Sequence, residues 1–488
     1  MSISGRKRTP WSIVLAMSSF SAVQCVVCGS GGLEAHDDVL ECPVCNRCYP
    51  VLSDIPILVP DVEVVPAAPF APATARRLIE AFGLEPTPVT TLRLRQASRR
   101  SVRFGDPGLN AEGSHFLACA KARGHAVTPG DPASPGTLPG RDLPRCRWLI
   151  DYIPRVMPPG REAMANVRFE NVGRVLMPSA GFGRITLTCV WRDAGGGAIP
   201  TGDLRTPLPV DVAPGRQMTL PIRLRAPPEP GQYTVTLTMV AEELSWLNED
   251  ARTIGVQVRR RTAFRQSPKW AAIPAQTGAG GRDQANGRTL LATWLKRHVP
   301  VQPRILEIGG NASPAIEGMP GDLYNVDLDL LGLQVAAIVA GQRGNRVRAI
   351  CADAHALPFD VDFFDAIVMV DTLHRFPDPA ALLRRLRGHL RQGGFIAACC
   401  EPVGHIWPGS VQPYFLAELQ RGANVQSFIL PEYDQIFQNA RLTPAEAAVE
   451  NTSLTVRLVV PASKPIMSLV ASELAPGLFQ LWTFDTGT

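Results

Sequence analysis

The spacing of apolar residues divides the chain into regions of different architecture. From about residue 145 apolar and polar positions alternate, most clearly in ITLTCVW (185–191), MTLPIRLRA (218–226) and YTVTLTMVA (233–241). A period of two predicts half-buried antiparallel strands. Short turns rich in Gly and Pro separate these strands, which is typical of a β-sandwich. We therefore predict an all-β sandwich over residues 145–262.

A second pattern follows a basic and Gly-rich linker at residues 263–288. Apolar runs that end on an acid or a glycine alternate with helix-length segments, which predicts a parallel, doubly wound α/β sheet. The predicted helices are LLATWLKRH and PAALLRRLRGHL, and the predicted strands are RILEIG, DLYNVDL, VRAICAD, DAIVMVD and GGFIAACCE. We place this α/β domain at residues 289–462 and a C-terminal tail at residues 463–488.

The N-terminal part has no single period. Residues 22–60 hold a cysteine cluster, and residues 61–144 combine a helical patch, ATARRLIEAFGL, with connectors such as TPGDPASPGTLPG. Because Pro and Gly interrupt regular structure, we expect the second stretch to pack poorly. The chain is thus predicted to be multidomain.

The first residues, MSISGRKRTPWSIVLAMSSFSA, imitate a signal peptide, because a basic stretch precedes a short apolar one. Serines interrupt the apolar stretch and no clear small-residue cleavage site follows it. We therefore predict a cytoplasmic protein that starts at Met1 or at Met17. No stretch approaches the roughly 18 consecutive apolar residues that a membrane helix needs.

Composition limits the classes of partner. The 488 residues are 45% hydrophobic, which supports globular cores, and the formal net charge of +5 predicts no strong field for nucleic acid or membrane. The eleven cysteines are an odd count, and several stand alone in apolar runs, unlike a secreted disulfide framework. Partners must therefore be argued from individual sites.

The N-terminal cysteines have metal-ligand spacing. CVVC and CPVC are two C-x2-C knuckles, and each tight turn directs two thiolates at one point, as a tetrahedral structural Zn²⁺ requires. The predicted ligands are Cys25, Cys28, Cys42 and Cys45. Cys48 forms a further C-x2-C with Cys45 and competes as the fourth ligand. Unmetallated thiols or a redox pair are the alternatives.

The same segment, LECPVCNRCYPVLSDIPILVP, resembles the small zinc ribbon of the methyltransferase-activator type. In that family the second knuckle runs into Tyr-Pro and a D-G-I-P turn. Here Ser53-Asp54-Ile55-Pro56 replaces the turn without its glycine. The resemblance implies a ribbon that stands beside a methyltransferase, either as a partner subunit or as an N-terminal fusion.

A second resemblance lies in ILEIGGNAS, residues 305–313. This loop lacks the GxGxxG fingerprint of dinucleotide sites. It resembles the E/D-x-G-x-G-x-G motif of class I S-adenosylmethionine-dependent methyltransferases (type 11-like), with Glu307 and Gly309 in place and Asn311 and Ser313 at the other glycine positions. Asn tolerates a left-handed backbone. Ser313 before Pro314 predicts the N-cap of a helix.

The following segments keep the order of that family, over about residues 289–402, and imply its Rossmann-like fold. In LYNVDLD, Asp327 stands where the family binds both ribose hydroxyls of the cofactor, and Asp329 competes for that role. In ICADAHALPF, Asp353 matches the acid that receives the adenine amino group, and Ala354 offers a backbone N–H to the ring.

The remaining segments resemble the fourth and fifth strands of the family with their loops. They are FFDAIVMVDTLHRFPDP and LLRRLRGHLRQGGFIAACCEP. Glu307, Asp327 and Asp353 are expected to converge at the carboxyl edge of the sheet. Strand-end acids often cap the next helix instead, and we expect Asp371 to be such a case.

The resemblance implies transfer of an activated methyl group, for which the protein mainly supplies alignment. A hydroxyl or amine acceptor must lose a proton at some stage. His374, just past the fourth strand, and Glu401, after the fifth, are the candidate catalytic bases. His374 could instead hold structure or substrate.

The acceptor is predicted from the sandwich. Its sequence resembles Ig-like modules attached to bacterial enzymes and transporters that handle cell-surface polysaccharide. We therefore expect a glycan or glycolipid precursor as acceptor. Trp191 or Trp246 could stack on sugars, or could belong to the sandwich core.

Two other functions stay open. An RNA methyltransferase would use the basic runs RLRQASRRSVRF and RRRTAFR as phosphate contacts, but these runs have few aromatic residues for base stacking. A non-catalytic scaffold would result if Asn311 and Ser313 had closed the cofactor loop. A protein partner could bind through the ribbon or the sandwich.

Overall fold

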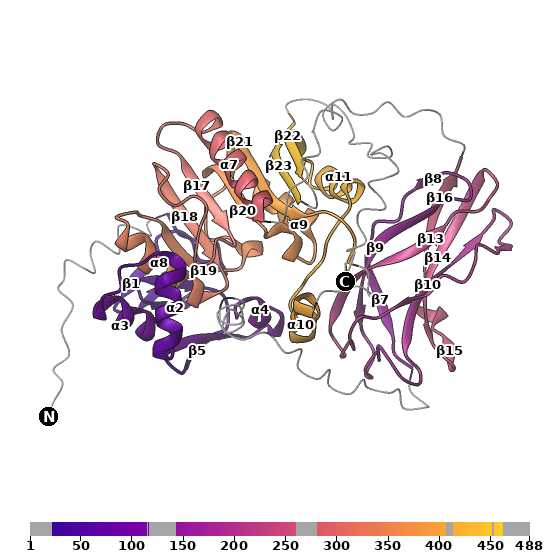
Figure 1. Ribbon diagram of the computed structural model, residues 1–488, viewed down its shortest axis with the longest axis horizontal. Helices are drawn as coiled ribbons and strands as arrows, with labels where there is room; N and C mark the ends of the chain where they lie inside the picture. The colour runs from indigo at the N-terminus through magenta and orange to yellow at the C-terminus, as the bar shows by residue number, and fades with distance from the viewer. Residues whose placement is uncertain are drawn as a thin grey trace.

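The computed structural model describes residues 22–114, 116, 143–259, 281–406, 413–450 and 453–461. They form an α/β part and a part made of two β-sheets (Figure 1). The α/β part combines chain segments from before and after the two-sheet part. The two-sheet part is therefore inserted into the sequence of the α/β part.

The predicted parallel sheet is confirmed. Its strands lie in the order β19 (Arg348–Ala352), β18 (Asp322–Asp327), β17 (Arg304–Ile308), β20 (Phe364–Val370) and β21 (Leu390–Pro402), and antiparallel β23 (Ser453–Val459) and β22 (Thr443–Glu450) follow at one edge. The chain runs outward from β17 in both directions, so the strand order reverses between β17 and β20. Open α/β sheets bind ligands at this reversal, outside the carboxyl ends of the strands.

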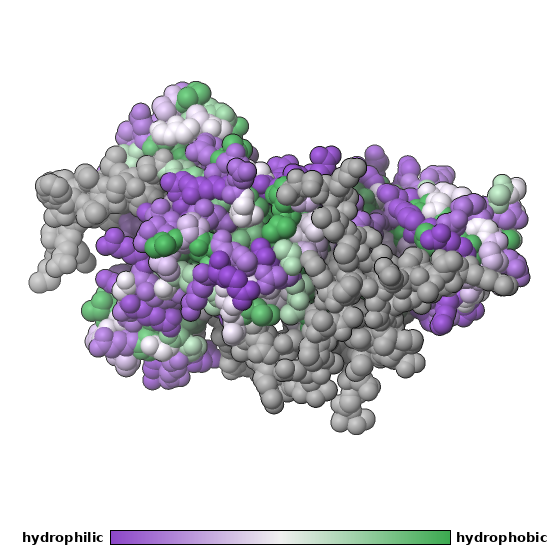
Figure 2. Space-filling view, turned by 90° about the horizontal axis from the view of Figure 1, so that it is seen from above, coloured by the Kyte–Doolittle hydropathy of each residue, from purple (hydrophilic) through white to green (hydrophobic). Residues whose placement is uncertain are grey.

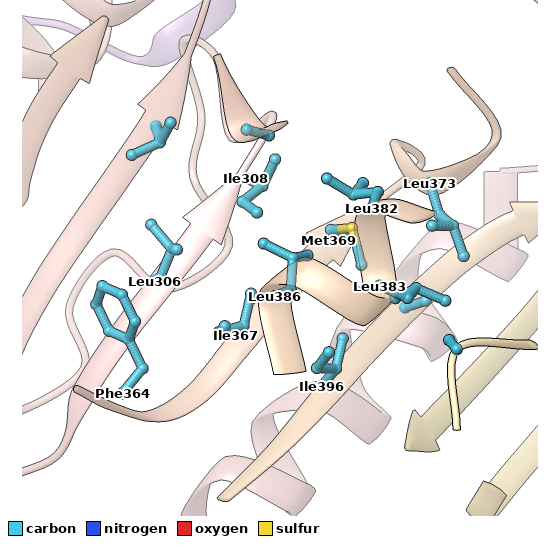
Figure 3. Close-up of a cluster of buried hydrophobic side chains, with 14 of the residues drawn as sticks. Leu306, Ile308, Phe364, Ile367, Met369, Leu373, Leu382, Leu383, Leu386 and Ile396 are labelled. Carbon is cyan, nitrogen blue, oxygen red and sulfur yellow. The ribbon is translucent and has the colours of Figure 1, made fainter. Parts of the chain in front are cut away.

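Helices cover both faces of this sheet, because successive strand residues are apolar on both sides. Ile305 of β17 packs against α7 (Gly281–His298), whereas Leu306 and Ile308 pack on the opposite face. That face is covered by α9 (Pro379–Arg387) and α11 (Leu430–Asn439). Figure 3 shows Leu382, Leu383 and Leu386 of α9 among side chains of the strands, which include Leu306, Ile308, Ile367, Met369 and Ile396.

The cysteine segment extends the same sheet. Its strands are β1 (Glu34–His36), β2 (Val39–Glu41), β3 (Cys48–Leu52) and β4 (Ile55–Leu58), and β4 pairs in parallel with β19. All four residues of β4 are buried. Ser53 and Asp54, with φ of 54° and 64°, form the two-residue turn between β3 and β4. Both turn residues are left-handed, as a type I′ hairpin requires, so the turn forms without the family's glycine.

Residues 61–104 pack well, contrary to our expectation for residues 61–144, and the predicted helical patch forms a helix here. The connector TPGDPASPGTLPG lies outside the described residues. The strands β5 (Val62–Pro66) and β6 (Arg100–Phe104) pair with each other, and α2 (Pro72–Phe82) and α3 (Pro88–Ala97) lie between them in the chain. Leu78 of α2 and Leu94 of α3 pack with Val335 of α8 (Leu330–Gln342). Pro72 and Pro88 occupy the first turns of α2 and α3. Proline is favoured there because no N–H is needed, so these prolines start helices and do not mark a linker. The short helix α4 (Pro107–Glu112) follows.

The predicted helix after Ser313 is absent. Between β17 and β18 the backbone makes only single turns, with hydrogen bonds from Glu317 N to Pro314 O (3.3 Å) and from Met319 N to Ile316 O (3.1 Å). Gly318 and Gly321 follow at once with positive φ, which ends any helix. The N-cap prediction for Ser313 was therefore wrong.

The alternating strands of the two-sheet part are confirmed. One sheet has the order β13 (Gln217–Arg225), β9 (Glu162–Asn171), β7 (Cys146–Asp151). The other has the order β11 (Ala198–Ile199), β10 (Ile185–Arg192), β14 (Gly231–Ala241), β16 (Arg252–Val258), β8 (Val156–Met157), with β12 (Thr206–Pro207) on β10 and β15 (Ser245–Trp246) on β14. The inward residues of both sheets form one core. An Ig-like connectivity stays a prediction.

The two candidate sugar-stacking tryptophans have different environments. Trp191 is fully buried in the core of the two-sheet part, so it cannot stack on a ligand. Trp246 is 43% exposed, but the Arg205 guanidinium already lies 4.7 Å from its ring centroid. Neither ring is a ready platform for a sugar.

The two parts meet through a buried interface. Asn166 of β9 donates from its backbone N and its side-chain Nδ2 to the Glu432 carboxylate of α11, at 2.8 and 3.0 Å, and Nδ2 also donates to Ser427 O at 2.7 Å. Leu416 and Leu419 of α10 (Pro413–Arg421) pack against the core of the two-sheet part. In Figure 1, α10 and α11 lie between the large sheet and β9. The two-sheet part is thus fixed in place by packed side chains.

The surface carries little apolar material in one view. Seen from above, polar residues dominate the described surface and apolar residues form small groups (Figure 2). Within the described residues, no helix combines the length and the apolar character needed to cross a bilayer.

We expect Asn166→Ala to lower the free energy of unfolding by about 2 to 4 kcal/mol, because the buried Glu432 carboxylate and the Ser427 carbonyl each lose the hydrogen bond from Asn166 Nδ2. Urea denaturation measures the change. Asn439→Ala, which removes an equal but exposed amide at the end of α11, is the matched control and should alter stability far less. Equal effects of the two substitutions would contradict the proposed importance of this interface.

Candidate functional site

A cavity of about 1460 Å³ opens at the carboxyl edge of the sheet, where the strand order reverses. From the α/β part its lining comprises residues 308–313, 326–328, 352–355, 370–372 and 375–377. The opposite wall includes residues 210–218 of the two-sheet part and residues 419–424 after α10. The cavity is therefore built by both parts of the protein.

The loop after β17 makes the tight turn that its sequence predicts. Gly309 has φ of 74° and Asn311 has φ of 44°, so Asn311 adopts the left-handed conformation. A Cβ at Gly309 would lie 2.5 Å from the Thr372 side chain, and one at Gly310 would lie 2.6 Å from the Asn325 amide oxygen. Both glycines are therefore needed for close approach of neighbouring chain, and Asn311 is tolerated.

Asp327 and Asp329 have different surroundings. Asp327 lines the cavity and accepts the backbone N–H groups of Asn311 (3.1 Å) and Asp329 (2.9 Å). Asp329 is 1% exposed and caps α8 by accepting Gly332 N at 3.1 Å. It also accepts the backbone N–H of Phe116. Of the two competing acids, Asp327 is the one at the cavity.

Asp353 and Ala354 both line the cavity, next to the end of β19. The Asp353 carboxylate accepts His355 N at 2.9 Å and caps the short 3₁₀ helix η2 (Ala354–Ala356). The predicted convergence of Asp327 and Asp353 at one edge is thus met in space. Their contacts with a cofactor stay predictions.

Glu307 lies behind the loop and is not among the cavity-lining residues. It is 1% exposed, and its Oε2 accepts Ile316 N at 3.0 Å. Burial raises the pKa of Glu307 from its ordinary 4.5 to about 7. Its geometry is that of a residue that positions the cofactor loop.

His374 and Glu401 form a buried pair. His374 lies in the 3₁₀ helix η3 (Leu373–Arg375), with Nδ1 3.0 Å from Glu401 Oε2. Glu401 also accepts the backbone N–H groups of Thr372 (3.0 Å), Leu373 (2.9 Å) and His374 (3.0 Å). Neither side chain is among those that line the cavity. The expectation that one of them faces the acceptor as a base does not fit this geometry, because both are engaged in holding the loop.

Asp371 is a residue whose role the sequence misjudged. We expected a helix cap, but Thr372 occupies the N-cap position of η3. Asp371 instead has φ of 54°, lines the cavity, and has a side chain that is 49% exposed. Its Oδ1 lies 4.0 Å from His374 Nδ1. Among the acids at the loop after β20, Asp371 is the one whose residue lines the cavity.

No sequence pattern indicated the cavity residues that come from the two-sheet part. Arg168 of β9 and Arg216 line the cavity although they lie far before the loop that follows β17 in the sequence. They reach the cavity only because β9 docks on α11. A basic residue in an alternating strand looks like any other solvent-facing position.

The four predicted cysteine ligands come together. Their Sγ atoms all lie within 4.8 Å of one another, with Cys25–Cys45 and Cys28–Cys42 separations of 3.6 Å. A tetrahedron with Zn–S bonds of about 2.3 Å has edges of about 3.8 Å, so the geometry fits a metal ion. The Ser30 hydroxyl, 3.0 Å from Cys42 Sγ, lowers the pKa of that thiol to about 6. Cys48 lies outside the group.

The metal group is separate from the cavity. Among the described residues that line the cavity, none is a cysteine. A closed set of four thiols leaves no open position for a substrate. The group can therefore stabilise structure but has no direct route to chemistry in the cavity.

Known proteins share part of this chain. Residues 306–398 match the family model of a methyltransferase domain. Over 149 residues the chain is 27% identical to a demethylmenaquinone methyltransferase of Mycobacterium marinum, covering 30% of this chain and 63% of that protein. The chain thus spans less than two thirds of that relative.

Solved structures also resemble the chain. The YcgJ protein of Bacillus subtilis is 23% identical with a TM-score of 0.28, over 33% of this chain and 71% of its own. A SAM-dependent methyltransferase of Aquifex aeolicus is 14% identical with a TM-score of 0.29, over 38% of this chain and 94% of its own.

The raised pKa of Glu307 predicts a pH effect on stability. Between pH 4.5 and 7 the folded state binds more protons than the unfolded state, so stabilisation that is present below pH 4.5 is lost as the pH rises through 7. Relative to Glu307→Gln, we expect wild-type stability to fall by up to about 1.4 kcal/mol per pH unit in this window. Urea denaturation at several pH values measures both proteins, and parallel pH profiles would show that the raised pKa is wrong.

Proposed function

We propose that the protein is an S-adenosylmethionine-dependent methyltransferase that binds its cofactor at the carboxyl edge of β17, β18 and β19. The observation that carries the proposal is that Gly309, Asp327 and Asp353 all line one cavity at the reversal of strand order. The match of residues 306–398 to a methyltransferase domain supports it. When bound, the cofactor supplies an activated methyl group on sulfur.

The residues at this edge fit the parts of such a cofactor. A carboxylate has about four acceptor sites, so the two backbone contacts of Asp327 do not exclude a pair of ribose hydroxyls. Asp353 would receive the adenine amino group, and the Ala354 N–H would donate to the ring. The turn at Gly309 leaves backbone without a side chain beside the bound ligand.

Proton transfer from a hydroxyl or amine acceptor would involve the loop after β20. Asp371 reaches the cavity, and His374 lies behind it in contact with Glu401. We assign Asp371 as the group that can accept the proton. His374 and Glu401 are positioning residues, because they fix the backbone that carries Asp371.

The proposed acceptor is a glycan or glycolipid precursor. The placement of residues 210–218 in the cavity wall supports a role of the two-sheet part in binding the acceptor. The RNA alternative has less support: residues 93–104, which hold one basic run, do not line the cavity, and most of RRRTAFR lies outside the described residues. The left-handed Asn311 removes the main reason for a scaffold without cofactor.

The four-cysteine group is proposed to bind a structural Zn²⁺. The metal would hold the turns around Cys25 and Cys42, and β3 and β4, which follow Cys45, extend the large sheet. A reducing compartment, as expected for the cytoplasm, keeps such thiols available. The metal would thus stabilise the outer edge of the cofactor domain.

Titration calorimetry with S-adenosylmethionine tests the cofactor site. We expect Asp327→Ala to weaken binding about a hundredfold, because a charged acceptor of two hydroxyls is lost. Asp322→Ala removes a carboxylate from the opposite end of the same strand, where it pairs with Arg348, and should leave binding near the wild-type value. Absence of binding by folded, zinc-loaded wild-type protein would refute the proposed function.

Metal analysis of purified protein tests the zinc site. We expect a single zinc ion per chain, lost in Cys42→Ser together with thermal stability, because binding of a structural metal is coupled to folding. Cys48→Ser makes the same change outside the cluster and should retain the metal. Zinc loss in both variants would show that Cys48 belongs to the ligand set.

A further inference from the structure

The wall of the cavity opposite the cofactor edge carries a buried guanidinium. Arg168 is 5% exposed and donates from Nε and Nη2 to Gln217 Oε1 (3.2 and 2.9 Å) and from Nη1 to Thr219 Oγ1 (2.9 Å) and Asn424 Oδ1 (2.8 Å). All of these acceptors are neutral, and no carboxylate within the described residues makes an ion pair with Arg168. One N–H of Nη2 is left for a ligand, so Arg168 would act on an anion chiefly through its charge. Burial lowers the pKa of Arg168 to about 10, so the side chain stays charged at neutral pH. Buried charges are normally paired with an opposite charge, so the Arg168 guanidinium suits an anionic ligand.

Two further arginines stand beside it. Arg216 has no side-chain hydrogen bond within the described part of the chain and lies so close to Gly422 that a Cβ there would overlap its guanidinium. Arg421 has buried Nε and Nη2 atoms without a hydrogen-bond partner, and its Nη2 lies 3.6 Å from Glu418. Buried unsatisfied donors often mark a site for an ion. Three guanidinium groups from both parts of the protein thus line one region of the cavity.

The carboxylates of this region already have partners. Glu418 pairs with Arg375 at 3.1 Å as well as with Arg421, and Glu112 accepts Asn424 N at 2.8 Å. Asp211 accepts the backbone N and the hydroxyl of Ser179, both at 2.8 Å. Glu418 is thus shared between two guanidinium groups, whereas Glu112 and Asp211 are held by neutral donors.

Hydrogen bonds link the arginine group to the loop after β20, which contains Asp371 and η3. Asn424 accepts from Arg168 Nη1 and donates from Nδ2 to Arg375 O at 2.7 Å. Arg375 ends η3, which begins two residues after Asp371. One amide side chain thus connects the buried guanidinium with the loop at the carboxyl end of β20.

We propose that Arg168, Arg216 and Arg421 bind an anionic group, a phosphate or a carboxylate, on the methyl acceptor. This inference rests on the proposed methyltransferase function and names the class of its acceptor: a small anionic molecule or an acidic glycan unit. Arginine suits this task because its planar fork of N–H donors matches both anions. The two-sheet part supplies Arg168 and Arg216, so it selects the acceptor.

The geometry favours one enclosed anion over a nucleic-acid strand. An RNA-binding surface needs a series of exposed phosphate contacts and aromatic platforms for bases. Here the key guanidinium is almost fully buried, and Phe376, which lies against His355, and Phe116 and Phe82 are the aromatic residues among the described lining. We therefore argue for a small anionic acceptor and treat RNA as an outcome of the test.

The experiment is calorimetric titration of full-length, zinc-loaded protein with inorganic phosphate in one arm and glucuronate in the other. We expect Arg216→Gln to weaken binding of the preferred anion about ten- to a hundredfold, because hydrogen bonds from a charged donor are lost. Arg168→Lys keeps the charge but loses the fork, and should weaken binding less. Arg223→Gln makes the same charge change on the outside of β13, where Arg223 pairs with Glu162, and should bind like wild type. The stronger arm identifies a phosphate or a carboxylate acceptor.

Titration of the same variants with S-adenosylmethionine separates this inference from the proposed function. Cofactor binding retained in Arg216→Gln, together with weakened anion binding, supports the inference and shows that the variant is folded. The anion-binding inference would be overturned if the wild-type protein binds cofactor but no anion. It would also be overturned if Arg216→Gln leaves anion binding unchanged. In both cases the methyltransferase function stands. Anion binding that depends on Arg216, without cofactor binding, would refute the function and keep the anion site. Bound phosphate can also be displaced by a short single-stranded RNA or by glucose phosphate. If the RNA displaces it at the lower concentration, the inference that the acceptor is a small anion is overturned.

Discussion

Carboxylates at the ends of strands hold this site together by accepting backbone N–H groups from loops at the carboxyl edge of the sheet. Glu307 accepts Ile316 N, Asp327 accepts Asn311 N, and Glu401 accepts the amides of η3. Each loop leaves the sheet with N–H groups that no strand or helix pairs, and a buried amide without an acceptor is costly. The same few acids therefore fix the backbone around the cavity. Whether an acid also meets a ligand depends on which side of its loop it occupies, and Asp327 is on the cavity side whereas Glu307 and Glu401 are behind it.

The cysteine segment and the two-sheet part both make structural contacts with the α/β part, so the chain is not a series of independent domains. The cysteine segment ends in β4, which pairs with β19 and so continues the cofactor sheet. The two-sheet part is held by Asn166 against Glu432, a contact between buried polar groups that needs both partners. His405 lies 3.0 Å from the same carboxylate. Both appended segments therefore bear on the shape of the cavity, one from the outer edge of the sheet and one from across the opening.

The sequence predicted what local pattern controls. Period-two alternation identified the strands of the two-sheet part, the paired C-x2-C turns identified the four clustered thiols, and the ordered strand ends identified the α/β sheet with Asp327 and Asp353 at one edge. It failed where tertiary contacts decide. The left-handed Asp371 and the burial of His374 depend on Glu401, which lies a strand away. Pro72 and Pro88 look alike whether they begin helices or interrupt a linker, and only packing against Val335 distinguishes these cases.

The residues proposed to bind the cofactor and those proposed to bind the acceptor lie on different walls of the cavity. The residues assigned to the cofactor lie between Gly309 and Ala354, whereas the arginines that face them come from β9, from the residue before β13 and from the end of α10. Substitutions in one set leave the contacts of the other in place, so affinity for cofactor and for acceptor can change independently. Asn424, which bonds both Arg168 and the backbone of Arg375, links the arginines to η3 after β20. A shift of β9 relative to α11 would therefore displace Arg168 from the loop after β20. Alignment is the main contribution that a protein makes to the proposed methyl transfer, so under that proposal the buried docking contact is part of what makes the site work.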